Sequence, residues 1–173
     1  MSESSEKCEV CGFVWDAINP SQISMRINLA VTAFAGMLRD QPEVALVRPT
    51  EGRWSSLEYG CHVRDVLFNI RDRIVLGAVE DNPQPKALHG TPRVELGLYK
   101  TETAVGVAED LMVAGGLFGR TFDALPVGFN ERPIFYWGTR PATRTLMWVA
   151  AQALHECEHH LDDARTNFSL FLP

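Results

Sequence analysis

Apolar residues recur every three or four positions in four long stretches of this chain, which is the spacing of one face of an α-helix. In the first stretch this face comprises Ile23, Ile27, Val31, Phe34 and Leu38. Asn19 suits the N-cap and Pro20 the first helical position, while Pro42 cannot continue a helix. The pattern predicts a helix that begins at residue 20 and closes at Pro42, followed by an extended segment over 44–49.

The second stretch begins with a capping box, the Ser-x-x-Glu motif of Ser55 and Glu58, which marks a helix N-terminus. Its predicted inward face comprises Tyr59, Val63, Val66, Leu67, Ile70 and Ile74. His62 lies three residues after Tyr59 and four before Val66, so it shares this face. We therefore expect the His62 side chain to point into the interior of the protein.

The third stretch predicts a helix from about residue 101 to 125, with Gly115 and Gly116 near its centre. Each glycine weakens a helix by roughly 1 kcal/mol relative to alanine, and close approach of a second helix is one reason to accept that loss. The predicted inward residues are Ala104, Val107, Leu111, Ala114, Phe118 and Leu125.

The fourth stretch predicts a helix from about residue 143 to 168. Its predicted inward residues are Met147, Ala151, Leu154, Leu161, Ala164 and Phe168. A neighbouring stripe, which we place on the same side of the helix, comprises Trp148, Gln152, His155, His159 and Asp162.

Two long connections separate these helices. Residues 81–100 hold three prolines and two glycines and predict a long connection with room for a short turn of helix, and residues 127–141 predict a short aromatic hairpin or lid. We therefore predict an all-α fold, a four-helix bundle with long crossover connections. It would occupy residues 19–173, preceded by a short N-terminal Cys-x-x-Cys segment over 1–18.

Composition narrows the function classes. The chain has 173 residues, of which 46% are hydrophobic and 22% are charged, as in an ordinary globular domain. Its net charge of −6 argues against a nucleic-acid partner, which would require a clustered basic surface. No apolar run approaches the ~20 residues of a membrane span, and no signal peptide is apparent, so we expect a cytoplasmic protein without a membrane partner.

Three of the five histidines lie within residues 155–160. His155 and His159 are four apart and share one helix face, a spacing at which two imidazoles can bind one ion. With His62 from a facing helix they would form a three-histidine site for a divalent metal that leaves a position open for water or substrate. Zn²⁺ is the expected ion, ahead of Ni²⁺, Mn²⁺ and Fe²⁺.

Other interpretations of the same residues stay open. His62 alone fits a hydrogen-bonded core histidine, and the pair of His155 and His159 alone fits a solvated helix face. His160 lies about 100° around the helix from His159 and is assigned to the surface or to a supporting role. The candidates to orient the ligand rings are Asp65, Glu158 and Asp162.

Cys8 and Cys11, with Gly12 directly after them, resemble one half of a zinc ribbon, but the second Cys-x-x-Cys is absent. A second metal site with other ligands, a redox-active dithiol and no special role are equally open for this pair. Cys61 and Cys157 are expected to be ordinary small core residues.

The segment from Trp54 to Leu67 (WSSLEYGCHVRDVL), followed by Leu154 to Asp163 (LHECEHHLDD), resembles the DinB/YfiT superfamily. The closest resemblance is to its actinobacterial branch, which often opens with Cys-x-x-Cys-Gly-Phe. The resemblance covers nearly the whole chain. It implies a four-helix bundle that holds a divalent metal on three histidines, at the positions of His62, His155 and His159 here. Characterised relatives include mycothiol- and bacillithiol-dependent S-transferases and a maleylpyruvate isomerase, while fold and ligands do not by themselves fix the reaction.

The resemblance implies an enzyme in which the metal activates a low-molecular-weight thiol such as mycothiol for attack on a small electrophilic substrate. A metal-dependent hydrolase and a non-enzymatic metal- or redox-responsive binding protein are the alternatives. The residues expected to wall the pocket are Tyr59, Trp148, Gln152 and the aromatics 135–137, with Arg64, Arg140 or Arg144 for acidic groups. A homodimer is also expected, as in relatives.

Overall fold

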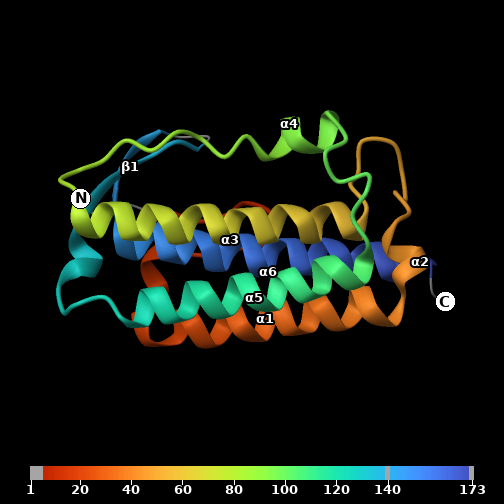
Figure 1. The fold of residues 1–173 in the computed structure, drawn as a ribbon, viewed down its shortest axis with the longest axis horizontal. Helices are drawn as coiled ribbons and strands as arrows, with labels where there is room; N and C mark the ends of the chain where they lie inside the picture. Colours follow the sequence, from red (N-terminus) through yellow and green to blue (C-terminus); the bar gives the residue numbers. More distant parts are fainter. Residues whose placement is uncertain (1–5, 139–140, 172–173) are drawn as a thin grey trace.

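The computed structural model describes residues 6–138 and 141–171. Four long helices lie side by side and form the body of the protein (Figure 1): α1 (Pro20–Asp40), α3 (Ser56–Val79), α5 (Ala104–Asp123) and α6 (Leu146–Phe171). Helix α1 packs against α5 and α6, and α3 packs against the same two helices, so α1 and α3 are diagonal neighbours. The predicted four-helix bundle is confirmed.

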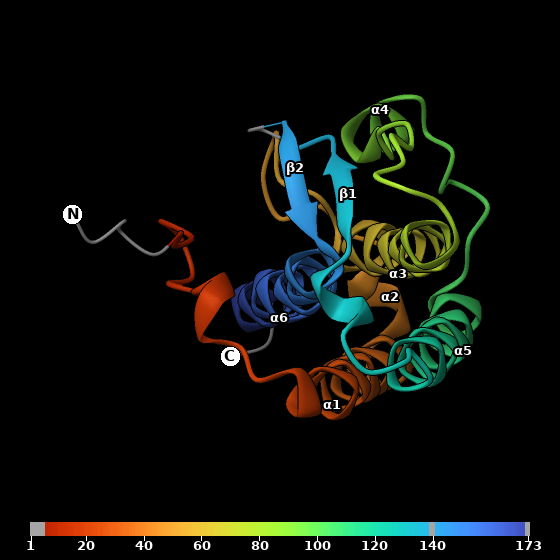
Figure 2. The ribbon, with the colours of Figure 1, turned by 90° about the vertical axis from the view of Figure 1, so that its left-hand side faces the viewer.

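The connection between α3 and α5 runs back along the length of the bundle (Figure 1). Helices α3 and α5 therefore point the same way, while α1 and α6 point the opposite way. This crossover carries the short helix α4 (Gly90–Glu95), as the turn of helix expected in this connection. Together with the hairpin before α6 it covers the long side of the bundle that α3 and α6 form (Figure 1 and Figure 2).

The helix starts follow the capping residues. The Asn19 side chain accepts a hydrogen bond from the backbone N–H of Ser21, and the predicted capping box of Ser55 and Glu58 forms in full. Helix α5 begins three residues later than expected, because the Thr103 side chain caps it by accepting from the N–H of Gly106.

Two expectations about local structure were wrong. Residues 42–45, whose second half was expected to be extended, form the short helix α2 (Pro42–Ala45), since Pro42 stands at a first helical turn where its missing N–H is not needed. Helix α6 begins at Leu146 and not near residue 143, because residues 142–145 are used as a strand.

That strand belongs to the predicted hairpin. Strand β1 (Pro133–Tyr136) pairs antiparallel with β2 (Ala142–Thr145), and 3-10 turns lie at Phe129–Glu131 (η2) and Trp15–Ala17 (η1). Arg132 fastens the hairpin to the end of α3 by donating from Nε to the Gly77 carbonyl at 2.8 Å. The hairpin is therefore held beside the C-terminal end of α3 and the N-terminal end of α6.

The apolar faces of the four helices meet in one core. Nearly all the residues predicted to face inward are buried, and only Leu125 and Met147 are half-buried. Gly115 marks a close approach of α5 to α1, since a Cβ atom there would lie 2.8 Å from Cγ2 of Val31. Gly116 faces outward, where a Cβ atom would meet only the flexible end of Arg120. None of the helices described is long and apolar enough to span a membrane.

These two glycines predict opposite effects on stability. We expect Gly115→Ala to lower the free energy of unfolding by about 1–2 kcal/mol, because overpacking against Val31 outweighs the better helix propensity of alanine. Gly116→Ala, the matched control, should raise it by up to about 1 kcal/mol. Urea unfolding followed by circular dichroism measures both, and an equal gain in the two variants would contradict the close approach.

Candidate functional site

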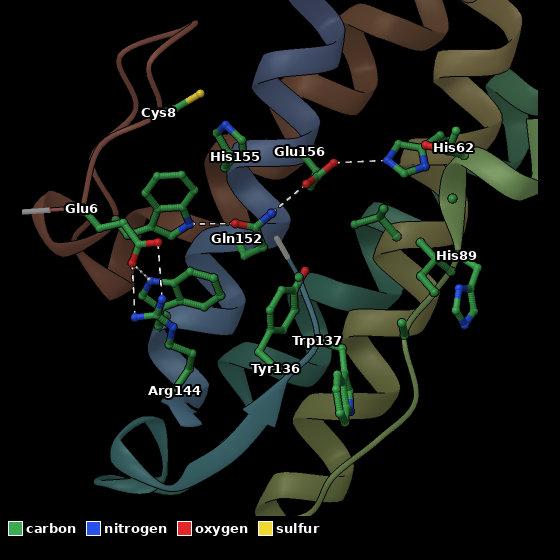
Figure 3. Close-up of a pocket in the computed structure, with 18 of the residues that line it drawn as sticks. Glu6, Cys8, His62, His89, Tyr136, Trp137, Arg144, Gln152, His155 and Glu156 are labelled. Carbon is green, nitrogen blue, oxygen red and sulfur yellow. Dashed lines mark hydrogen bonds and ion pairs between the residues drawn. The ribbon is translucent and has the colours of Figure 1, made fainter. Parts of the chain in front are cut away.

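A carboxylate lies between two imidazoles where α3 faces α6. Glu156 Oε2 is 3.2 Å from Nε2 of His62 on α3 and 3.3 Å from Nε2 of His160, one turn further along α6. One ligand atom from each of the three lies within 4.8 Å of the other two, so they form a candidate metal site, called here the inner cluster. Figure 3 shows Glu156 directed across the gap toward His62.

His160 is held in a fixed orientation. Its Nδ1 is 2.9 Å from Asp163 Oδ2, which leaves Nε2 facing the cluster, and Tyr59 stacks on the ring with centroids 5.1 Å apart. Burial opposes protonation of His160, but the carboxylates of Asp163 and Glu156 outweigh it and raise its pKa to about 9. A carboxylate behind the far ring nitrogen is the usual support of a metal-binding histidine.

Glu156 is ionised in this setting. Burial by itself would raise its pKa, but hydrogen bonds to His160 and His62 favour the carboxylate and hold the pKa well below its ordinary range. The ring of His62 is confined from the other side by Gly90, at the first residue of α4, where a Cβ atom would lie 2.7 Å from Nδ1. The crossover connection thus reaches the cluster through a residue without a side chain.

A second group of ligand-type residues is called here the outer cluster. Figure 3 shows two of its members, Cys8 and His155, on the side of Glu156 away from His62. The outer cluster joins Cys8 and Cys11 of the N-terminal segment to His155 and His159 of α6, with one ligand atom of each within 4.8 Å of the others. Both ring nitrogens of His155 and Nδ1 of His159 are buried and have no hydrogen-bond partner within residues 6–138 and 141–171. Burial lowers the pKa of His155 to about 4, so its imidazole is neutral near pH 7.

The two thiols of the outer cluster differ. Burial would raise the pKa of Cys8, but hydrogen bonds from the backbone N–H groups of Cys11 and Val10 favour its thiolate, and the pKa lies below the ordinary value. For Cys11 burial prevails and the pKa is raised. Both cysteines are free thiols.

A hydrogen-bonded relay connects the N-terminal segment with the inner cluster. The indole Nε1 of Trp15 donates to Gln152 Oε1 at 2.8 Å, and Gln152 Nε2 donates to Glu156 Oε1 at 2.6 Å. Because both oxygens of Glu156 are then engaged, the carboxylate has a defined orientation. Trp15 also stacks on Trp148, with centroids 5.9 Å apart and planes 12° from parallel.

A cavity of about 810 Å³ opens beside this relay. It lies between the N-terminal segment, α3, the start of α4, the hairpin and α6, and it reaches His62 and Glu156 directly. His160 is not among its lining residues and lies beneath Tyr59 and Trp54. The inner cluster therefore has one side open to the cavity and one side closed by aromatic rings.

The three histidines expected to share an ion fall into different groups. Within the part of the chain that the structure describes, His62 groups with Glu156 and His160, whereas His155 and His159 group with the two cysteines. His159 also lies within 4.8 Å of His160 and Asp163, but none of these groups contains both His62 and His155 or His159. Successive residues of a helix are about 100° apart, and the buried residues of α6 centre on the face of Leu154 and Leu161. His155 and His159 lie on the face turned away from them, so their stripe is covered by the N-terminal segment and not by α3.

The other predicted positions are placed as follows. Trp148, Gln152, Tyr136, Trp137 and Arg144 line the cavity, whereas Tyr59 packs behind His160. Arg144 pairs with Glu6, and Arg140 lies outside the described residues.

The residues proposed to orient the ligands do not do so. Asp65 binds Arg93 and Tyr99, Glu158 binds Arg26, and Asp162 binds Arg165, all away from both clusters. Arg64 is held by Asp65, Glu102 and Asp110 and is not among the residues that line the cavity. Cys61 and Cys157 are buried core residues, as expected.

Sequence reasoning missed Glu156 as a ligand and assigned His160 to the surface or to a supporting role. The signal was present, since Glu156 and His160 are also four residues apart and start one position later than His155 and His159. The direction of the apolar face favours this second register, because His160 follows Cys157 by three residues and precedes Ala164 by four, both of which are buried.

Comparison with known proteins places the fold. No protein-family model matches the sequence, and no curated protein matches it. Among solved structures, the chain is similar to YfiT from Bacillus subtilis, with a TM-score of 0.73 over 89% of this chain and 90% of that one, at 18% sequence identity. YfiT is described as a probable metal-dependent hydrolase with an unusual four-helix bundle topology. This similarity confirms the expected fold, a four-helix bundle like that of YfiT.

The relay through Gln152 can be tested by stability. We expect Gln152→Leu to lower the free energy of unfolding by about 1–3 kcal/mol, because it leaves the Trp15 N–H unpaired and removes a donor from a buried carboxylate. Trp15→Phe should be less destabilising, by about 1 kcal/mol, in the Gln152→Leu background than in the wild type. Strictly additive effects in this double-mutant cycle would contradict the hydrogen bond between the two side chains.

Proposed function

We propose that this protein is a metal-dependent hydrolase of small molecules whose divalent ion is bound by His62, Glu156 and His160. The observation that carries the proposal is the convergence of these three donors within 4.8 Å of one another, in a cluster that reaches the cavity through His62 and Glu156. This ligand set replaces the one expected from the sequence, in which His155 and His159 accompanied His62.

The donor set fits a metal ion in three respects. Two imidazole nitrogens and one carboxylate oxygen are ligands that Zn²⁺ takes, and two histidines with one glutamate form the site of several zinc hydrolases. Asp163 orients His160 from behind, and Gln152 holds the second oxygen of Glu156. Zn²⁺ is the ion we propose first, and Fe²⁺, Mn²⁺ and Ni²⁺ remain the other candidates.

The composition of the ligand set suits hydrolysis. Three neutral histidines would leave the full +2 charge of the ion uncompensated, which favours a bound hydroxide or a bound thiolate, whereas Glu156 removes one unit of that charge and gives the site the two-histidine, one-glutamate composition of zinc hydrolases. When bound, such an ion acts as a Lewis acid and lowers the pKa of a water molecule in its open position.

Side chains around the cavity would position the substrate. Burial raises the pKa of Tyr136 to about 12, so its hydroxyl stays protonated and can donate a hydrogen bond to an oxyanion of the substrate. Its ring points from the hairpin toward the segment of α6 that carries Gln152 (Figure 3). Trp15 and Trp148 form an apolar wall beside it, which excludes water and favours a substrate with an aromatic or aliphatic part.

A thiol-dependent S-transferase is the second candidate. The size of the cavity, about 810 Å³, favours it, because this volume accommodates a drug-sized ligand and thus a thiol cofactor such as mycothiol together with a small electrophile. The same ligands would serve both reactions. The cytoplasmic location and the homodimer remain predictions that neither candidate requires.

Two conservative substitutions on the same helix test the metal site. We expect Glu156→Gln to lower Zn²⁺ affinity of the inner cluster by at least about 100-fold, because it removes the only anionic ligand of the set, and to abolish chelator-sensitive turnover. Glu158→Gln, the matched control, breaks an ion pair with Arg26 away from the cluster. It should leave both the Zn²⁺ affinity and the turnover unchanged. Calorimetric titration of the metal-free protein with Zn²⁺ measures affinity, and a panel of ester and amide substrates measures turnover.

The nucleophile separates the two candidate reactions. With the Zn²⁺-loaded protein, hydrolysis of esters without added thiol supports the hydrolase, whereas conjugation of an electrophile only when a thiol is supplied supports the S-transferase. Unaltered Zn²⁺ affinity in Glu156→Gln would refute the proposed ligand set for either reaction.

A further inference from the structure

We infer that Cys8, Cys11, His155 and His159 bind a second, structural Zn²⁺ ion, which fastens the N-terminal segment to α6 and thereby builds one wall of the cavity. Four protein ligands close the coordination sphere of zinc and leave no position for substrate, which is the arrangement of structural sites. This site is distinct from the inner cluster, with which it shares no ligand.

The spacing of the ligands is that of a Cys₂His₂ zinc finger. Two residues separate the cysteines and three separate the histidines, within the ranges that this class uses. In a zinc finger the cysteines come from a hairpin and the histidines from a helix. The same pieces meet here, although they come from opposite ends of the chain.

The N-terminal segment has the backbone of such a hairpin. Lys7 and Val14 form an antiparallel bridge, the Cys8 N–H donates to the Phe13 carbonyl at 2.8 Å, and the Gly12 N–H donates to the Cys8 carbonyl at 2.9 Å. Gly12 has φ of +78°, a left-handed conformation that favours glycine and turns the chain directly after Cys11. Both thiols therefore project from one tight turn.

His155 and His159 have buried ring nitrogens that are available to bind a metal ion. Both ring nitrogens of His155 and Nδ1 of His159 are buried and have no hydrogen-bond partner among the residues that the structure describes, although a buried polar group without a hydrogen bond destabilises a fold. A metal ion would engage one nitrogen of each ring. Nε2 of His159 lies 3.7 Å from Asp163 Oδ2, which is a charge contact longer than a hydrogen bond, so Nδ1 is the ring nitrogen of His159 that is most available to bind an ion.

A disulfide between Cys8 and Cys11 would account for fewer features of the outer cluster than a metal ion does. It would engage the two sulfur atoms and leave the donors of His155 and His159 as they are, whereas a metal ion uses all four residues. Phe13 and Trp15 also pack on the His155 ring, with centroids 5.2 Å and 4.8 Å away, so this ring is enclosed by the same segment that carries the thiols.

The consequence concerns the cavity. Residues 6–9 and Trp15 line it, and Trp15 holds Gln152, which in turn holds Glu156. Trp15 and the ion pair of Glu6 with Arg144 also hold this segment, but they lie at its two ends, so the ion would be the attachment of the turn between them. Loss of the ion should therefore loosen residues 6–15 without unfolding the bundle.

Substitution of Co²⁺ for Zn²⁺ in the full-length protein tests the site. We expect the reduced wild-type protein loaded with Co²⁺ to show the intense thiolate-to-metal charge-transfer absorption of tetrahedral cysteine ligation. The Cys8→Ser/Cys11→Ser protein should lose this absorption and about one equivalent of bound Zn²⁺ per chain by elemental analysis. Amide hydrogen exchange should become faster at residues 6–15 in this variant and stay unchanged in α1 and α5.

Two controls assign the signals. Glu156→Gln should keep the thiolate absorption, which separates the outer cluster from the proposed catalytic ion. Cys157→Ala removes a thiol located between the two histidines in sequence but buried on another face, and it should also keep the absorption. Absence of the absorption in the reduced wild type, or wild-type Zn²⁺ content in Cys8→Ser/Cys11→Ser, would overturn the inference.

Discussion

The directions in which successive side chains project from helix α6 decide how the candidate metal ligands of this protein are grouped. Residues one apart on a helix diverge by about 100°, so His155 and Glu156 point into different surroundings although they are adjacent in sequence. Glu156 and His160 point toward α3 and meet His62, whereas His155 and His159 point away from the bundle and meet Cys8 and Cys11. A single helix thus supplies two clusters of metal-type ligands on two of its faces.

The two clusters are physically connected through the N-terminal segment. Residues 6–15 cover the outer face of α6, and the hydrogen bonds from Trp15 through Gln152 to Glu156 extend from that cover to the inner cluster. Glu156 can face both imidazoles only in one orientation of its carboxylate, and the hydrogen bond from Gln152 fixes that orientation. A structural ion at the chain's beginning and a catalytic ion between helices would therefore be parts of one arrangement.

The fold was largely predictable because the helices are long and their apolar periodicity is strong. Capping residues also placed the starts of α1 and α3 correctly, since these side chains act on the backbone beside them. Predictions from local sequence patterns were wrong where the element that formed instead was short. Residues 142–145 became a strand through pairing with β1, and that partner lies outside any helical window.

The sequence alone determined the bundle, its apolar faces, and the presence of two unusual ligand motifs, Cys-x-x-Cys and His-x-x-x-His, because spacing and periodicity are local properties. The tertiary structure decided which residues combine. The spacing of four that joins His155 to His159 also joins Glu156 to His160, and only the packing of α6 on α3 and beneath the N-terminal segment distinguishes the two pairs. Ligands that come from three separate segments are brought together by packing, and no pattern within one segment contains that information.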